Sequence, residues 1–218
     1  MSEHLPRPDG ARIRSTAPTA DDLSVVPVGT TLVRVHPLGG AHPTGWNELR
    51  SFGPTKGRFD HQPLPRRNHP TRRIAYLTTG HSAFTAALAE FFQDDGGGVP
   101  PFDLALRQPT ITMFETVTAL TLLDLGGGWI TRAGGNQAIR TGPRGTCRDW
   151  SRAIYRHHTN VQGLLYGSSV WGPGRCLALW ERAIPASPAA PTATRQLDDP
   201  AIAPAVMDAA LTLGTFVL

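Results

Sequence analysis

The stretch SAFTAALAEFF at residues 82–92 decides how the chain is interpreted, because it predicts a largely apolar helix with a single carboxylate, Glu90. An ionised group among such neighbours costs several kcal/mol unless it is paired or hydrogen-bonded. Upstream of this helix, an arginine follows a glycine in Gly57-Arg58-Phe59, and Tyr76 lies in a short apolar run. Arg58, Tyr76 and Glu90 are therefore the first candidates for chemistry.

The other segments predict a mixed α+β fold. A helix is expected at residues 147–156, where apolar residues recur at helical spacing, and a strand or a short helix at residues 117–125. Short runs rich in β-branched and apolar residues predict strands at 30–35, 74–78, 104–106, 111–114, 161–166 and 176–180. Helices and strands do not alternate regularly, which argues against a doubly wound parallel sheet.

Composition limits the classes of function. The chain of 218 residues suits one domain with tails, and its net charge of +4 permits an anionic ligand. Its two cysteines cannot form a disulfide framework or an all-cysteine zinc site, and no metal site is predicted. The sequence shows no apolar signal segment or membrane span, so we expect a cytoplasmic protein with no membrane partner.

Several short motifs, in a shared order, resemble the RES domain family, which is named for its Arg, Glu and Ser. They lie at residues 34–36 (RVH), 57–59 (GRF), 76–77 (YL), 87–90 (ALAE), 149–154 (DWSRAI), 163–169 (GLLYGSS) and 176–179 (CLAL). Each motif alone is weak, but the order makes the match fairly specific over roughly residues 30–184. The resemblance gives residues 25–184 as a RES-like catalytic domain. Residues 1–24 are then a flexible arm, and residues 185–218 are a Pro/Ala-rich linker and tail.

The resemblance implies an ADP-ribosyltransferase-like fold, in which a split mixed or antiparallel sheet with flanking helices forms a cleft for NAD. Members of the family are toxins of toxin–antitoxin pairs that break the bond between nicotinamide and ribose. NAD is thus expected as a substrate with no resident cofactor, and water or inorganic phosphate as its acceptor. The expected partner is an Xre-type helix-turn-helix antitoxin that covers the site. The sequence leaves open whether the chain forms a homo-oligomer.

The matching positions suit this chemistry. Breaking the bond leaves oxocarbenium-like charge on the ribose, which the Glu90 carboxylate can stabilise. Arginine forks suit the two phosphates of NAD, and Arg58 and Arg34 occupy the matching positions. Tyr76 offers a ring to stack on nicotinamide and a hydroxyl to hold it. Ser168 can hydrogen-bond the nicotinamide amide or the adjoining ribose.

Each role has a simpler structural alternative. Arg34 could be a surface residue at a strand end, Arg58 could pair with a loop carboxylate, Tyr76 could belong to the core, and Glu90 could reach solvent. Either Ser168 or its neighbour Ser169 could face the cleft. Val170 stands where relatives often have an arginine, a contact that Arg175 or the arginine-rich loop at residues 66–73 could replace.

Two other functions fit the same sequence. The cleft could transfer ADP-ribose to a macromolecule, and labelled NAD would then leave its label on protein or nucleic acid. The chain could instead be a non-catalytic module that binds nucleic acid or protein, and salt-sensitive nucleic-acid binding without NAD turnover would favour that function.

Overall fold

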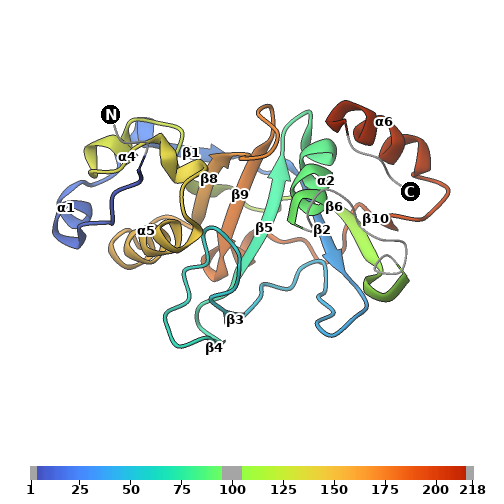
Figure 1. The fold of residues 1–218 in the computed structure, drawn as a ribbon, viewed down its shortest axis with the longest axis horizontal. Coiled ribbons are helices and arrows are strands. Elements are labelled where there is room, and N and C mark those ends of the chain that lie inside the picture. The colour runs from blue at the N-terminus through green and yellow to red at the C-terminus, as the bar shows by residue number, and fades with distance from the viewer. Residues whose placement is uncertain (1–3, 95–104, 215–218) are drawn as a thin grey trace.

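A computed structural model describes residues 4–94 and 105–214, and an eight-stranded sheet forms its centre (Figure 1). The strand order is β1-β7-β8-β9-β5-β2-β6-β10, with β7 and β8 parallel and the other neighbours antiparallel. The strands are β1 (Leu23–Val26), β2 (Thr31–Pro37), β5 (Ile74–Thr79), β6 (Pro109–Glu115), β7 (Leu120–Asp124), β8 (Gly163–Gly167), β9 (Arg175–Trp180) and β10 (Ala193–Gln196). The predicted α+β class is thereby confirmed.

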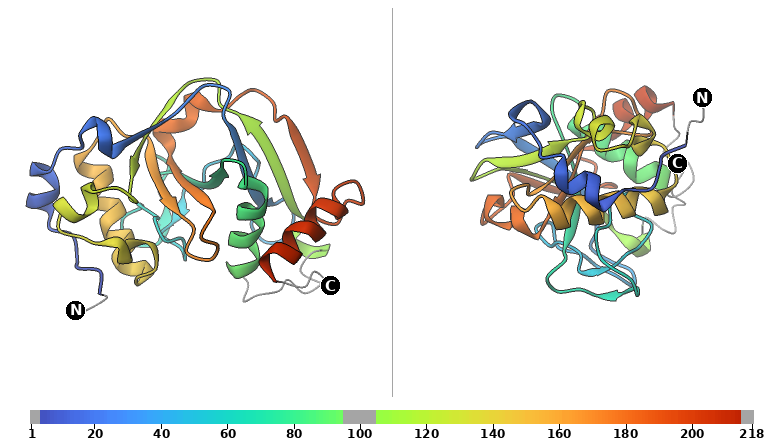
Figure 2. Two further views of the ribbon diagram at one scale, coloured as in Figure 1. Left: turned by 90° about the horizontal axis from the view of Figure 1, so that it is seen from above. Right: turned by 90° about the vertical axis from the view of Figure 1, so that its left-hand side faces the viewer.

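Helices flank this sheet at both ends (Figure 2). The α-helices are α1 (Gly10–Ser15), α2 (Ala83–Asp94), α4 (Trp129–Arg132), α5 (Arg144–His157) and α6 (Ala203–Leu213). Short 3-10 helices are η1 (Ala20–Asp22), η2 (Gln137–Arg140) and η3 (Glu181–Ala186). A small hairpin-like sheet of β3 (Phe52–Gly53) and β4 (Arg67–Asn68) lies on the segment between β2 and β5. In the part of the chain described here, no helix is both long and apolar enough to cross a membrane.

The large sheet is split between β2 and β5. These two strands pair only at Leu32 with Thr79 and at Val33 with Thr78. Beyond that point β2 continues to pair with β6, and β5 continues to pair with β9. Helix α2 packs against both strands and joins the two halves of the sheet. The expected split sheet is therefore present, and its open end lies between residues 34–37 and residues 74–77.

The side chains of β5 point alternately to the two faces of the sheet, and apolar clusters cover both faces. Ile74 and Tyr76 pack with the apolar cluster beneath α5, which also contains Trp150 and Trp180. Ala75 and Leu77 point to the opposite face and join a second cluster. Successive side chains of a strand point to opposite faces, so both faces of this strand are apolar and buried. A third cluster fills the space between β2, β6, α2 and α6.

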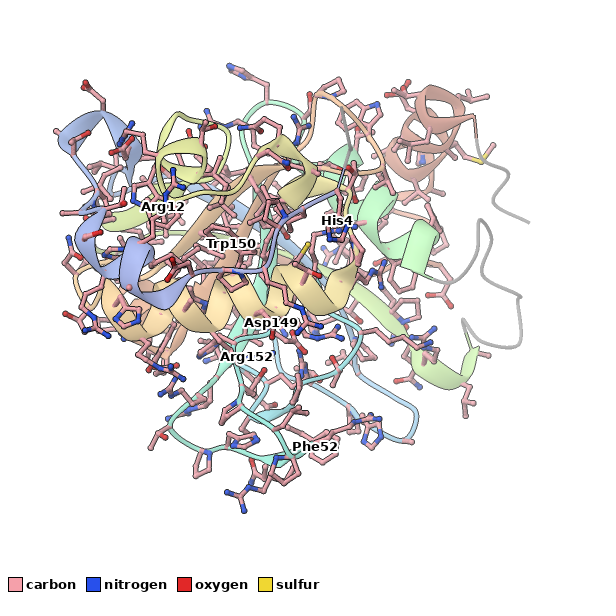
Figure 3. The ribbon with its side chains drawn as sticks, turned by 60° about the vertical axis from the view of Figure 1, so that its left-hand side comes forward. His4, Arg12, Phe52, Asp149, Trp150 and Arg152 are labelled. Atoms are coloured by element: carbon pink, nitrogen blue, oxygen red, sulfur yellow. The ribbon has the colours of Figure 1, made fainter. Side chains whose placement is uncertain are left out.

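The N-terminal segment is packed, which corrects the prediction of a loose arm for residues 4–24. Leu5 and Ile13 are each 0 % exposed and belong to the cluster beneath α5. The indole N–H of Trp150 donates to the Pro6 carbonyl at 2.8 Å, and the Arg12 Nε donates to the Arg132 carbonyl at the same distance (Figure 3). Burying one such aliphatic side chain contributes roughly 1.5–3 kcal/mol, which outweighs the polar composition of the segment.

The C-terminal segment also belongs to the fold up to residue 214, so the predicted Pro/Ala-rich linker and tail at residues 185–218 is corrected for its described part. Strand β10 pairs with β6 and forms one edge of the sheet. Helix α6 packs on α2, and its Val206 and Ala209 are buried in the third cluster. Position 184 therefore does not end the folded unit.

Two local predictions are resolved by the structure. Residues 105–107 are helical, so the strand expected at 104–106 is wrong for its described part, while Leu104 lies outside the described residues. Of the two alternatives for residues 117–125, the strand is present as β7. It pairs with β1 on one side and with β8 on the other, and this pairing decides between strand and helix.

Candidate functional site

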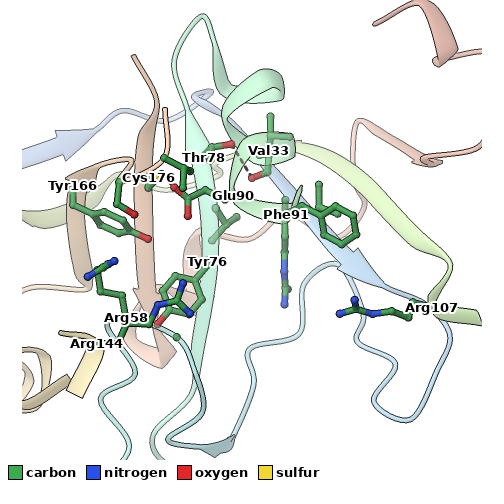
Figure 4. Close-up of a pocket in the computed structure, with 17 residues that line it drawn as sticks. Val33, Arg58, Tyr76, Thr78, Glu90, Phe91, Arg107, Arg144, Tyr166 and Cys176 are labelled. Atoms are coloured by element: carbon green, nitrogen blue, oxygen red, sulfur yellow. Dashed lines mark hydrogen bonds between the residues drawn. The ribbon is translucent and has the colours of Figure 1, made fainter. Parts of the chain in front are cut away.

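A cavity of about 270 Å³ opens where the sheet splits (Figure 4). Its walls come from β2 and β5, from the face of α2 that carries Glu90, and from the loop around Arg58. Arg144 at the start of α5 and the turn with Ser169 and Val170 between β8 and β9 complete it. The lining combines apolar side chains and aromatic rings with five charged residues, and a concave site of this kind suits a small, charged ligand.

Glu90 is half-buried in the wall of this cavity. Its Oε1 accepts a hydrogen bond from the Ser168 hydroxyl at 2.6 Å and lies 3.6 Å from the Cys176 sulfur. The alternative that Glu90 simply reaches solvent is therefore wrong. The carboxylate is held in place at the cavity surface.

Ser168 holds Glu90 and has no hydrogen-bonding capacity left for a ligand. A serine hydroxyl has one donor and two acceptor positions. The donor is used on Glu90, and the acceptors receive the backbone N–H of Val170 at 3.1 Å and of Trp171 at 3.0 Å. Ser169 instead lines the cavity. The predicted contact of Ser168 with substrate is thus replaced by support of the carboxylate.

Both thiols near the cavity are held in their protonated form. Burial, reinforced by the neighbouring Glu90 carboxylate, raises the pKa of Cys176 far above its usual value. Burial also raises the pKa of Cys147, although Arg58 opposes the shift. The thiolate is the reactive form of cysteine, so these shifts disfavour a nucleophilic role for either residue.

Arg58 reaches the cavity from the loop before β4. One of its terminal nitrogens, Nη1, donates to the Gly142 carbonyl at 2.7 Å and lies 3.6 Å from the Cys147 sulfur. Within the described residues its hydrogen-bond partners are a carbonyl and a thiol rather than a loop carboxylate. The guanidinium is thus fixed at one nitrogen while the residue lines the cavity.

Arg34 is buried rather than exposed at a strand end. It is 8 % exposed, and its Nη1 donates to the carbonyls of Gly45, Trp46 and Glu48 at 2.7–3.2 Å. Burial lowers the pKa of Arg34 to about 10, so it stays cationic at neutral pH. The residue lines the cavity and also ties the loop after β2 to the sheet.

Tyr76 contributes its ring to the cavity, but its hydroxyl is engaged elsewhere. The hydroxyl donates to Asp60 Oδ1 at 2.8 Å and accepts the backbone N–H of Phe59 at 3.0 Å. Burial, with the nearby Asp60 carboxylate, raises the pKa of Tyr76 well above its usual range. A stacking role for the ring remains open, whereas a hydroxyl contact with nicotinamide is not supported.

Sequence reasoning missed Asp60, the buried centre of the loop that carries Arg58. Its Oδ1 accepts from Arg50 Nη2 at 2.6 Å as well as from Tyr76, and its Oδ2 accepts from the Thr55 backbone N–H and hydroxyl. A Cβ on Gly57 would overlap both Asp60 Oδ1 and the Tyr76 hydroxyl, so only glycine fits there. The signal in the sequence was the acidic residue two positions after Arg58.

The cavity also contains Arg107, Arg144 and Tyr166, which the sequence did not single out. Arg107 and Arg144 add two further cations to the cavity wall, which Val170 lines without a charge. Among the described lining residues, neither Arg175 nor the arginines of residues 66–73 appear. One of the latter, Arg72, stacks over the Tyr155 ring at 4.0 Å.

The fold has a solved counterpart. The chain superposes on a chain of the crystal structure of the M. tuberculosis MbcT–MbcA toxin–antitoxin complex with a TM-score of 0.56. The alignment covers 91 % of this chain and 96 % of the other, at 18 % sequence identity. The two chains share a fold. The sequence itself matches no protein-family model and no curated protein.

Proposed function

We propose that this chain is an NAD-degrading enzyme of the RES type, which cleaves the bond between nicotinamide and ribose. The observation that carries the proposal is the position of Glu90. It is the only carboxylate among the described residues that line the cavity, and it shares that cavity with four arginines, Arg34, Arg58, Arg107 and Arg144. A dinucleotide that bears two phosphates and develops positive charge at one ribose matches this distribution of charge.

In the proposed reaction the C–N bond between the ribose and nicotinamide breaks, and its electron pair leaves with neutral nicotinamide. The positive charge left on the ribose is stabilised by the Glu90 carboxylate, which Ser168 keeps in one orientation. Arginines at the cavity hold the phosphates. An acceptor oxygen from water or inorganic phosphate then forms the new bond to the ribose carbon and loses its proton.

The proposal includes a biological setting. The fold counterpart comes from a toxin–antitoxin complex, which supports a toxin role for this chain and an antitoxin as its partner. An Xre-type helix-turn-helix protein that covers the cavity is the proposed partner, and the cytoplasm, where NAD is available, is the proposed location. Induced expression should lower cellular NAD and stop growth, and co-expression of the antitoxin should restore both.

The decisive test is NAD consumption by the purified protein without its partner. Mass spectrometry of the products distinguishes ADP-ribose, formed with water, from ADP-ribose 1″-phosphate, formed with inorganic phosphate. Glu90→Gln is the matched control, because it keeps the size of the side chain and removes the charge. Intact NAD under all acceptor conditions would overturn the proposal, and label transferred from NAD to a macromolecule would replace it with ADP-ribosyl transfer.

A further inference from the structure

Tyr166 is a second tyrosine of the cavity wall, and its ring is rigidly placed. It lies in β8, two residues before Ser168, and is 8 % exposed. Its ring packs edge-on against Phe59, with centroids 4.6 Å apart and planes at 61°. The side chain is thus fixed by packing, and the residue lines the cavity.

The hydroxyl of Tyr166 has no hydrogen-bond partner within residues 4–94 and 105–214. The hydroxyls of the other two tyrosines are engaged, Tyr76 with Asp60 and Tyr155 with Glu181. The hydroxyl is not one of the fully buried polar atoms that lack a partner, so it is accessible from the cavity that the residue lines. Figure 4 shows Tyr166 at the cavity beside Arg58 and Cys176, with its hydroxyl directed into the open space.

The surroundings of this hydroxyl define what it can bind. Glu90, Cys176, Tyr76 and Arg58 are the titratable groups around it. Burial, with Cys176 and Glu90, raises the pKa of Tyr166 well above its usual range, so the phenol stays protonated and can donate. Anionic oxygens are better served by Arg58. A neutral donor close to Glu90 suits an uncharged oxygen.

We propose that the Tyr166 hydroxyl contacts the substrate and donates a hydrogen bond to an uncharged oxygen next to the bond that breaks. The inference rests on the proposed NAD cleavage. Near Glu90 that oxygen belongs to the nicotinamide carboxamide or to a ribose hydroxyl. A site built to hydrogen-bond a substrate group discriminates against analogues that lack it, so Tyr166 is a specificity-determining residue.

The test compares Tyr166→Phe with Tyr76→Phe, because both remove one hydroxyl from the same cavity wall. Tyr166→Phe should lower kcat/KM for NAD by about tenfold while the Tm stays equal or rises, since no contact within the protein is lost. Tyr76→Phe should lower the Tm, since its hydroxyl bridges Asp60 and Phe59. Equal kcat/KM for Tyr166→Phe and wild type would overturn the inference. So would a loss of activity accompanied by a fall in Tm as large as that of Tyr76→Phe.

Two substrate analogues identify the oxygen. With thionicotinamide adenine dinucleotide, whose sulfur accepts weakly, the difference between Tyr166→Phe and wild type should shrink if the carboxamide is the acceptor. With the 2′-deoxyribosyl analogue of NAD, the difference in kcat/KM between Tyr166→Phe and wild type should shrink if the ribose hydroxyl is the acceptor. A tenfold difference that persists with both analogues would contradict the assignment. Wild-type protein that neither cleaves NAD nor binds it in calorimetry would instead overturn the proposed function.

Discussion

Two carboxylates lie close to the cavity, and they differ in their burial and in how many of their oxygens are hydrogen-bonded. Asp60 is 0 % exposed and both of its oxygens accept hydrogen bonds, from Arg50, Tyr76 and Thr55. Glu90 is half-buried, and within the described residues its hydrogen bonds reach Oε1 alone. Asp60 is saturated by the fold, whereas Glu90 keeps one oxygen available to a ligand. Unused hydrogen-bonding capacity at a cavity therefore distinguishes the proposed catalytic carboxylate from the structural one.

The largest expected effect is on catalysis, at Glu90. Glu90→Gln should lower kcat for NAD cleavage by roughly 100-fold or more, because a preorganised charge that stabilises the transition state is removed. The Tm should change by only a few degrees, since the amide oxygen can still accept from Ser168. Single-turnover kinetics measure the rate of NAD cleavage, and thermal denaturation of the same preparations measures the Tm. A variant with wild-type kcat would remove the distinction between the two carboxylates.

Asp60 should show the opposite pattern, a large effect on stability. Asp60→Ala leaves Arg50, Tyr76 and Thr55 without their shared acceptor, and breaking a buried pair in this way costs about 3 kcal/mol of the free energy of unfolding. Urea denaturation measures this loss in the free energy of unfolding. Asp60→Asn, which keeps an acceptor oxygen, is the control and should lose less. Unchanged stability in both variants would contradict the structural role.

Ser168 and Ser169 provide a matched pair that sharpens the comparison. Ser168→Ala removes the donor to Glu90 and unpairs the backbone N–H groups of Val170 and Trp171. We expect stability to fall by about 1–2 kcal/mol and kcat by about tenfold. Ser169→Ala should leave stability within about 0.5 kcal/mol. Equal stability losses in the two variants would contradict the assignment of Ser168 as the support of Glu90.

A third carboxylate, Glu181, extends the comparison to pH. Burial raises the pKa of Glu181, but His61 and the Tyr155 hydroxyl outweigh it and hold the pKa at about 2. A folded-state pKa below the unfolded value gives stability that is present above the unfolded pKa and is lost as the pH falls toward 2. Glu181→Gln should therefore be about 1 kcal/mol less stable at pH 7. Denaturation between pH 7 and pH 2 should show the two proteins converging below pH 5, and a constant difference would contradict this.

Much of the fold follows from local patterns. A short run of β-branched and apolar residues predicts the strand at residues 74–78, and a longer, largely apolar run predicts the helix at 82–92; they correspond to β5 and α2. The same kind of local pattern does not predict that the N-terminal segment packs against the core. Its anchors Leu5 and Ile13 are isolated apolar residues in a polar stretch, and no local period marks them.

The sequence by itself determined that Glu90 lies on an apolar helix, and that Arg58 and Tyr76 precede it, because these are matters of residue type and order. Only the tertiary structure decided which polar groups remain available. Ser168 is bonded to a residue 78 positions away, and Tyr76 to the buried Asp60, while Tyr166 keeps a free hydroxyl within the described residues. Hydrogen-bond saturation depends on which distant segments meet, and no local pattern encodes that.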